Sequence, residues 1–121
     1  MDDYAYERLA DALDRLPNGF PRTPSRSEIR LLRKIFSPEE ASLACQLSGD
    51  FEAIDTIAKR LGHTVGDASA KLSEAAGRGL LWSDELEGKP RYRLAPFVVG
   101  IYESQLEKMD VEFAQLVEKY F

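Results

Sequence analysis

The stretch IDTIAKRLGHTVGDASAKLSEAAGRGLL, residues 54–81, decides the fold. Its first part places apolar residues at positions 54, 57, 58 and 61, which is the spacing of one helical face, and Gly62 ends that helix. Thr64-x-x-Asp67 opens a second helix, whose inner face carries Val65, Ala68, Leu72, Ala75 and Ala76. The tight turn at Gly62-His63 sets the apolar faces of the two helices against each other. The stretch therefore predicts a helix-turn-helix.

The apolar period changes after Gly79. Leu80-Leu81-Trp82 is a short strand, and Glu87-Gly88-Lys89-Pro90 is a turn signal. In a second strand Tyr92 and Leu94 alternate with arginines, which gives one apolar face. A helix-turn-helix followed by such a hairpin predicts a winged helix-turn-helix with a small β-hairpin wing.

Helical segments are expected on both sides of this core. Apolar residues at 6, 9, 13 and 16 predict an N-terminal helix, and a proline-rich loop follows it to residue 24. Ser25-x-x-Glu28 and Ser37-Pro38-Glu39-Glu40 resemble capping boxes, so helices are expected over about 26–36 and 38–48. An apolar stripe from Val98 to Tyr120 predicts one long C-terminal helix.

These expectations define a mostly α (α+β) fold with long terminal helices. The chain of 121 residues is the size of one domain. Residues 1–24 would form the N-terminal helix and loop, 25–95 the winged-helix core, and 96–121 the C-terminal helix.

The composition argues against several classes of function. The net charge is −5, so the chain lacks the basic character of most nucleic-acid-binding domains. One cysteine and one histidine argue against a multi-ligand metal site. No apolar run approaches the roughly 20 residues of a membrane span, and the acidic amphipathic N-terminus is not a secretory signal. A cytoplasmic protein without a membrane partner is expected.

Binding to DNA is the alternative that the fold itself suggests. Charges cancel within residues 63–79, which hold the second helix, and again within the wing at 80–95. DNA affinity rests mainly on phosphate neutralisation, so DNA is not the favoured partner. Contacts to nucleic acid, if made, would come from Ser69, Lys71, Ser73, Arg78, Arg91 and Arg93.

One basic stretch stands out in this acidic chain. It contains Arg22, Arg26, Arg30, Arg33 and Lys34 against a single acidic residue, Glu28. Two interpretations remain open. The stripe is either an anion or acidic-partner patch, or it pairs with the acidic terminal helices of the same fold, which is the interpretation we favour.

Catalytic chemistry has little support in the sequence. Cys45 lies among small residues of a helix and is expected to be buried, and His63 follows a helix end. Trp82 and Tyr92 fit packing within the hairpin better than ligand stacking. No nucleophile–base pair, phosphate loop or metal-ligand set stands out, so no catalytic, cofactor-binding or metal residues are assigned and the chain is not expected to be an enzyme.

The terminal helices suggest a partner surface. A helix of more than 20 residues with a wide apolar stripe is expected to leave part of it uncovered by so small a core. A homodimer or a docking surface is therefore expected at Leu9, Leu13, Ile101, Tyr102, Met109, Phe113 and Tyr120.

Four segments carry a family resemblance. They are LADALDRLPNGFPRT (9–23), EIRLLRKIFSPEEA (28–41), IAKRLG (57–62) and KPRYRLAPFVVGIYESQL (89–106). Together they resemble the N-terminal winged-helix region of 4Fe-4S ferredoxin-type proteins of anaerobic bacteria and archaea, which itself resembles MarR-like regulators.

The resemblance implies a non-catalytic interaction or docking module associated with a 4Fe-4S redox protein. The alternative is a dimeric MarR-like DNA-binding regulator. In such proteins the cluster ligands come from a cysteine-rich region that follows, and this chain has no Cys-x-x-Cys, so no ligand residue is carried over. No cofactor is expected in this chain. A 4Fe-4S cluster is expected only where a cysteine-rich region follows it.

Overall fold

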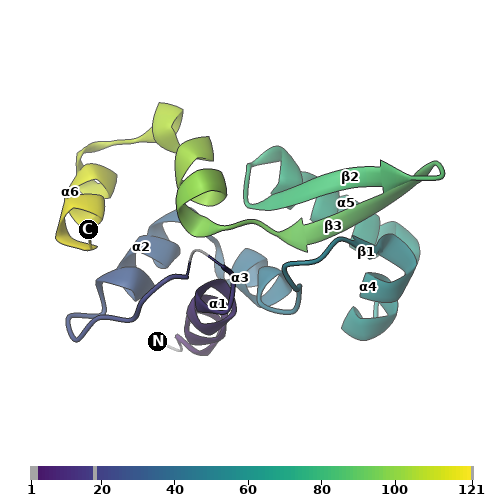
Figure 1. Cartoon of the computed structure of the whole chain (residues 1–121), viewed down its shortest axis with the longest axis horizontal. Helices are drawn as coiled ribbons and strands as arrows, with labels where there is room; N and C mark the ends of the chain where they lie inside the picture. The colour runs from purple at the N-terminus through teal and green to yellow at the C-terminus, as the bar shows by residue number, and fades with distance from the viewer. Residues whose placement is uncertain (1–2, 18, 121) are drawn as a thin grey trace.

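A computed structural model describes residues 3–17 and 19–120 (Figure 1). The helices are α1 (Tyr4–Asp14), α2 (Ser27–Ile35), α3 (Pro38–Ala44), α4 (Ile54–Leu61), α5 (Val65–Gly77) and α6 (Val111–Tyr120). The strands are β1 (Glu52–Ala53), β2 (Leu81–Leu86) and β3 (Lys89–Leu94). A π-helical segment η1 (Phe97–Tyr102) and a short 3-10 segment η2 (Leu106–Lys108) precede α6. The described chain is mostly helical with one small antiparallel sheet, as an α+β fold requires.

The sheet has the order β1-β3-β2, with all neighbours antiparallel. Its hairpin closes through Glu87 and Gly88, which have φ values of +53° and +79°. Positive φ at both turn residues matches the right-handed twist of the strands. The register pairs Trp82 with Arg93, so these two side chains share one face of the sheet.

Helices α4 and α5 pack against each other across the expected turn. Gly62 adopts a left-handed conformation with φ +72°, and the N–H of His63 donates to the carbonyl of Ala58 at 3.0 Å. The Thr64 hydroxyl caps α5 by accepting from the N–H of Asp67 at 3.1 Å. The prediction of a helix pair is confirmed, but Val65, expected on the inner face of the second helix, is 47% exposed.

The segment before α4 differs from expectation. The helix predicted from residue 54 is preceded by β1, a two-residue strand that pairs with β3 and that the apolar pattern does not predict. α3 also ends at Ala44 and not near residue 48. The chain leaves helical geometry there because it must reach the sheet edge, where the N–H of Leu94 donates to the carbonyl of Ser48 at 2.8 Å.

The two expected caps have different outcomes. Ser37 and Glu40 form the reciprocal capping box at the start of α3, with contacts of 3.1 Å and 2.8 Å. The capping box at Ser25 is wrong. The N-cap residue of α2 is Arg26, whose side chain makes no cap hydrogen bond. The Thr23 hydroxyl oxygen accepts from the N–H of Ser27 at 3.1 Å instead, and the Glu28 carboxylate accepts from the Thr23 N–H at 3.0 Å.

The C-terminal segment is not one long helix. Met109 is extended, with φ −67° and ψ 125°, and separates η2 from α6. The Asp110 carboxylate then accepts from the N–H of Phe113 at 2.8 Å, which caps a new helix. α6 folds back beside α2 at the left of Figure 1. An N-cap aspartate inside the apolar stripe thus overrides the helical period.

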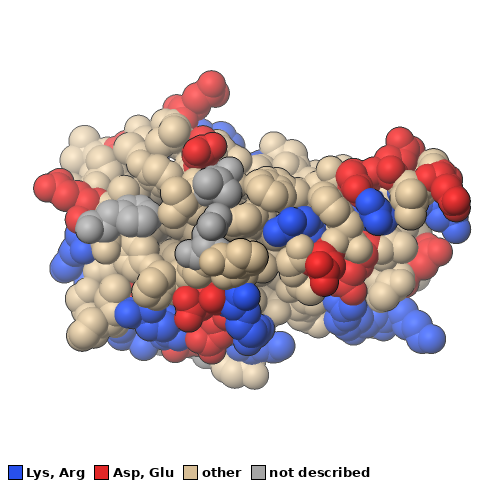
Figure 2. All heavy atoms as spheres, viewed as in Figure 1, with Lys and Arg blue, Asp and Glu red and all other residues tan. Residues whose placement is uncertain are grey.

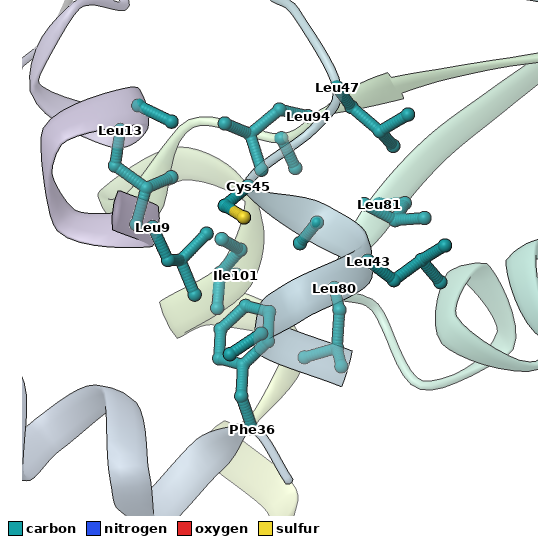
Figure 3. Close-up of a cluster of buried hydrophobic side chains, with 14 of the residues drawn as sticks. Leu9, Leu13, Phe36, Leu43, Cys45, Leu47, Leu80, Leu81, Leu94 and Ile101 are labelled. Carbon is teal, nitrogen blue, oxygen red and sulfur yellow. The ribbon is translucent and has the colours of Figure 1, made fainter. Parts of the chain in front are cut away.

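The core joins the N-terminal helices to the sheet (Figure 3). Leu9 and Leu13 of α1 meet Leu94 of β3 and Ile101 of η1, with Leu43 and Cys45 at the end of α3. The buried Tyr6 donates its hydroxyl proton to the carbonyl of Phe36 at 2.9 Å. The outer helices and the sheet therefore share one core and position each other.

Candidate interaction surfaces

The residues expected to contact nucleic acid lie on α5 and the hairpin. On α5, Lys71 and Ser73 are exposed, Ser69 is half-buried, and Arg78 follows the last turn. The Lys71 Nζ lies 3.5 Å from the Glu39 carboxylate of α3. Arg78 forms an ion pair with Glu40 and donates from Nη2 to the carbonyl of Ile35 at 3.0 Å. Both cations of this surface are therefore engaged by α2 and α3.

Two of the three hairpin cations also pair with carboxylates, and the third stacks on an aromatic ring. Arg91 forms a cross-strand pair with Asp84, with 2.8 Å between Nε and Oδ1. Lys89 lies 3.8 Å from the Asp55 carboxylate of α4. Arg93 stacks its guanidinium on the Trp82 ring, 4.9 Å from the centroid. Figure 2 shows acidic and basic side chains interspersed at the hairpin end of the molecule, at the right of the view.

The charge of Glu40 is built into the α3–α5 contact. Burial alone would raise the pKa of this carboxyl, but the hydrogen bonds from Arg78 and the Ser37 N–H outweigh burial and hold the pKa below its usual value. Glu40 is therefore ionised near neutral pH and compensates the Arg78 guanidinium. DNA phosphates would have to compete with this carboxylate.

The basic stripe is paired within the chain. Arg22 contacts Glu7 at 2.8 Å, Asp11 at 3.1 Å and Glu28 at 2.9 Å. Further pairs join Arg26 to Asp3 and Glu7, Arg33 to Asp3, and Lys34 to Asp110 and Glu112. Arg30 is exposed beside these residues. The carboxylates come mainly from α1 and the start of α6, so the structure favours pairing within the fold over a patch for an outside anion.

The expected partner surface needs correction. Leu9, Leu13, Ile101 and Phe113 are at most 3% exposed, so they belong to the core of the chain and not to its surface. Tyr102, Met109 and Tyr120 are only partly buried, but they pack against that core. Phe113 is buried because the break at Met109 folds α6 back onto α2, whereas Leu9, Leu13 and Ile101 are buried in the core that α1 and η1 share with β3. The larger exposed apolar side chains are elsewhere, at Tyr4, Val65, Leu86, Val98, Leu106 and Val111.

The candidate chemical residues have ordinary surroundings. Cys45 is 8% exposed, its thiol lies 3.2 Å from the carbonyl of Ser42, and burial raises the pKa of the thiol. His63 is exposed at the end of α4. Within residues 3–17 and 19–120, the structure contains no group of three or more His, Cys, Asp and Glu residues placed to hold a metal ion. In the same ranges no helix has the length and apolar character to cross a bilayer.

Sequence reasoning missed a surface around the loop at residues 45–50. Arg8 and Arg15 of the α1 region, Arg60 of α4 and Arg93 of β3 line two adjoining hollows there. These arginines come from widely separated segments and form no periodic pattern. Their convergence depends on the packing of α1 against the sheet, which no local motif could reveal.

Comparisons with protein-family models, with curated proteins and with solved structures gave no significant match. The ferredoxin-type resemblance therefore stands on the quoted sequence segments alone.

Proposed function

We propose that this chain is a winged-helix module that docks onto another protein and carries no catalytic site of its own. The interpretation as a winged helix is supported by the order of elements from α3 to β3, in which a helix, a short strand, two helices and a hairpin follow each other. It is also supported by the pairing of the short strand with the second hairpin strand. Because this architecture serves both protein and nucleic-acid binding, the surface must decide between them.

One observation carries the choice of a protein partner. Three of the four cations that this winged helix would offer to DNA phosphates are already bound by carboxylates of the same chain, in the pairs Lys71–Glu39, Arg78–Glu40 and Arg91–Asp84. DNA phosphates would have to displace these carboxylates before they could bind the same side chains. With a net charge of −5, the rest of the chain adds repulsion.

The nature of the partner comes from the sequence resemblance alone. It points to a 4Fe-4S ferredoxin-type protein, with the cluster outside these residues. A titration of the 15N-labelled chain with a purified 4Fe-4S ferredoxin tests this part. Shift changes confined to one surface are expected, and unchanged spectra at millimolar ferredoxin would refute the redox partner.

A dimeric MarR-like DNA-binding regulator is the second candidate, favoured by the exposure of most of the outer face of α5. Fluorescence anisotropy with a labelled 20-base-pair duplex at low salt separates the two. The docking proposal predicts that the duplex does not bind at micromolar protein concentrations. Proteins that bind DNA non-specifically have dissociation constants of about 10⁻⁴ to 10⁻⁶ M, so their binding would be detected in this range. Micromolar binding by the wild-type chain, lost in Lys71→Glu and Arg78→Glu, would establish the regulator instead.

A paired variant sharpens this test. Glu39→Gln with Glu40→Gln releases Lys71 and Arg78, while glutamine still fits the capping box at Ser37. We expect this double variant to bind the duplex more tightly than the wild-type chain. A matched variant, Glu103→Gln with Glu107→Gln, removes two exposed carboxylates elsewhere and controls for net charge.

A further inference from the structure

Two adjoining hollows open between the end of α1, the loop at 45–50 and the sheet. The first, of about 450 Å³, is lined by Arg15, Leu16, Asp50 and Arg93 among others. The second, of about 510 Å³, is more open and includes Arg8 and Arg60. Arg15, Leu47 and Ser48 belong to both, so the hollows form one continuous surface, here named the arginine hollow.

The arginine hollow differs from the other basic regions of the chain in how many of its cations are ion-paired. Arg8, Arg15 and Arg93 form no ion pair with any residue that the structure describes, whereas Arg60 is bound to Glu52. The acidic side chains of the lining are Asp50 and Glu52 against four arginines. A net positive surface thus lies on a protein whose total charge is −5.

The guanidinium of Arg93 is held in place above the first hollow. It stacks on Trp82 at 4.9 Å and on Phe51 at 5.8 Å, and its Nε donates to the carbonyl of Leu94 at 3.2 Å. Its Nη2 lies 3.9 Å from the point where a Cβ on Gly49 would be. These contacts orient the side chain and place Nη2 beside Gly49 of the loop, which reduces the ordering cost of binding an anion.

The floor of the hollow is apolar. Ala12, Leu16 and Leu47 are buried beneath the charged rim. Gly49 lets the loop approach this floor, because a Cβ there would lie 2.6 Å from Leu16 Cδ2. A cationic rim over an apolar floor matches a ligand that carries both carboxylates and an apolar side chain.

Building on the docking function proposed above, we propose that the arginine hollow receives an acidic segment of a partner protein, with carboxylates at the arginines and an apolar side chain on the floor. An acidic polypeptide fits better than nucleic acid. The rim is broken by Asp50 and Glu52, which a peptide can avoid with its spaced charges but a continuous phosphate backbone cannot.

The test uses the full chain and a fluorescein-labelled 12-residue peptide of Glu and Asp with two leucines. Anisotropy at low salt should show saturable binding that Arg15→Glu weakens by at least about tenfold, because the variant reverses a charge shared by both hollows. Lys108→Glu makes the same charge change at an exposed lysine of η2 and should weaken binding less than about twofold. Amide shifts should concentrate at residues 47–50.

Three results would overturn the proposal. The peptide does not bind, or the two charge reversals weaken peptide binding equally, or a single-stranded 12-mer DNA binds more tightly than the peptide and its binding is lost in Arg15→Glu. None of these depends on Lys71 or Arg78. Duplex binding through α5 would refute the docking function itself, whereas loss of peptide binding alone refutes only this site.

Discussion

The Nε of Arg22 lies 2.9 Å from the Oε2 of Glu28, whose side chain is wholly buried. The other oxygen of that carboxylate accepts from the Thr23 hydroxyl at 2.6 Å and from the Thr23 N–H at 3.0 Å. Arg22 reaches on to Glu7 and Asp11 of α1. A single buried carboxylate therefore ties the proline-rich loop and α2 to the first helix.

Replacing Glu28 by Gln should destabilise the fold by about 2 kcal/mol, because an amide cannot accept all three hydrogen bonds and leaves Arg22 partly uncompensated. Urea unfolding followed by circular dichroism measures the change. Glu112→Gln, at an exposed carboxylate that contacts Lys34, is the control and should change stability by less than about 0.5 kcal/mol. Equal stability of the two variants would contradict the role given to Glu28.

The same carboxylate predicts acid sensitivity. Burial would raise the pKa of Glu28, but the hydrogen bonds from Thr23 and Arg22 prevail and lower it. A folded-state pKa below the unfolded value of about 4.3 stabilises the protein above that pH, and the stabilisation is lost as the pH falls through the folded pKa. Stability should therefore drop below about pH 4.5, and Glu28→Gln should flatten this part of the curve. An unchanged acid slope in the variant would assign the sensitivity to other carboxylates.

Two neighbouring glycines offer a matched comparison of backbone demands. Gly79 has φ +80°, and a Cβ there would lie 2.2 Å from the Cβ of Ser104. Gly77, the last residue of α5, has nothing within 4 Å of its Cβ position. Gly79→Ala should cost about 2–4 kcal/mol, since it adds strain and a clash, whereas Gly77→Ala should be neutral or stabilising by up to about 1 kcal/mol. Thermal unfolding of both variants measures the contrast, and similar melting temperatures would refute the tight contact between Gly79 and Ser104.

The buried thiol makes a kinetic prediction. Cys45 is 8% exposed, and burial raises the pKa of its thiol, so little reactive thiolate forms at neutral pH. Iodoacetamide at pH 8 should modify the folded chain at least about tenfold more slowly than the urea-unfolded chain. Mass spectrometry over time follows the adduct. Rapid modification without urea would show that the end of α3 opens readily.

Local signals in the sequence were enough for the central elements. Gly62 and Thr64 specify the turn between α4 and α5, and the alternation around Tyr92 specifies the inward face of β3. These features depend on neighbours within a few residues, which is why they can be read from one sequence. The capping box at Ser37 belongs to the same class.

Features that depend on distant packing could not be read in this way. The apolar period continues through Met109, and only the Asp110 cap and the return of α6 onto α2 show that the helix is broken there. β1 has two residues and exists because β3 lies beside it. The arginine hollow likewise needs α1, α4 and β3 together, so no pattern along the chain predicts it.

The return of α6 yields the last prediction. α6 packs mainly on α2, and it is held by Phe113, which is 3% exposed, and by the Tyr120 hydroxyl, which donates to the carbonyl of Pro21 at 2.7 Å. Phe113→Ala removes the main apolar contact and should cost about 3 kcal/mol. Because α6 packs chiefly on α2, the loss should appear as local opening, with faster amide exchange in α6 than in α5.

Val111→Ala is the control for α6, because Val111 is 74% exposed and its truncation should change stability by less than about 0.5 kcal/mol. Hydrogen exchange measured by mass spectrometry resolves the two helices. If Phe113→Ala accelerates exchange equally in α5 and α6, the C-terminal helix unfolds with the whole domain. Faster exchange in α6 alone would instead show that the break at Met109 separates a detachable helix from a core that α1, α3 and the sheet hold together.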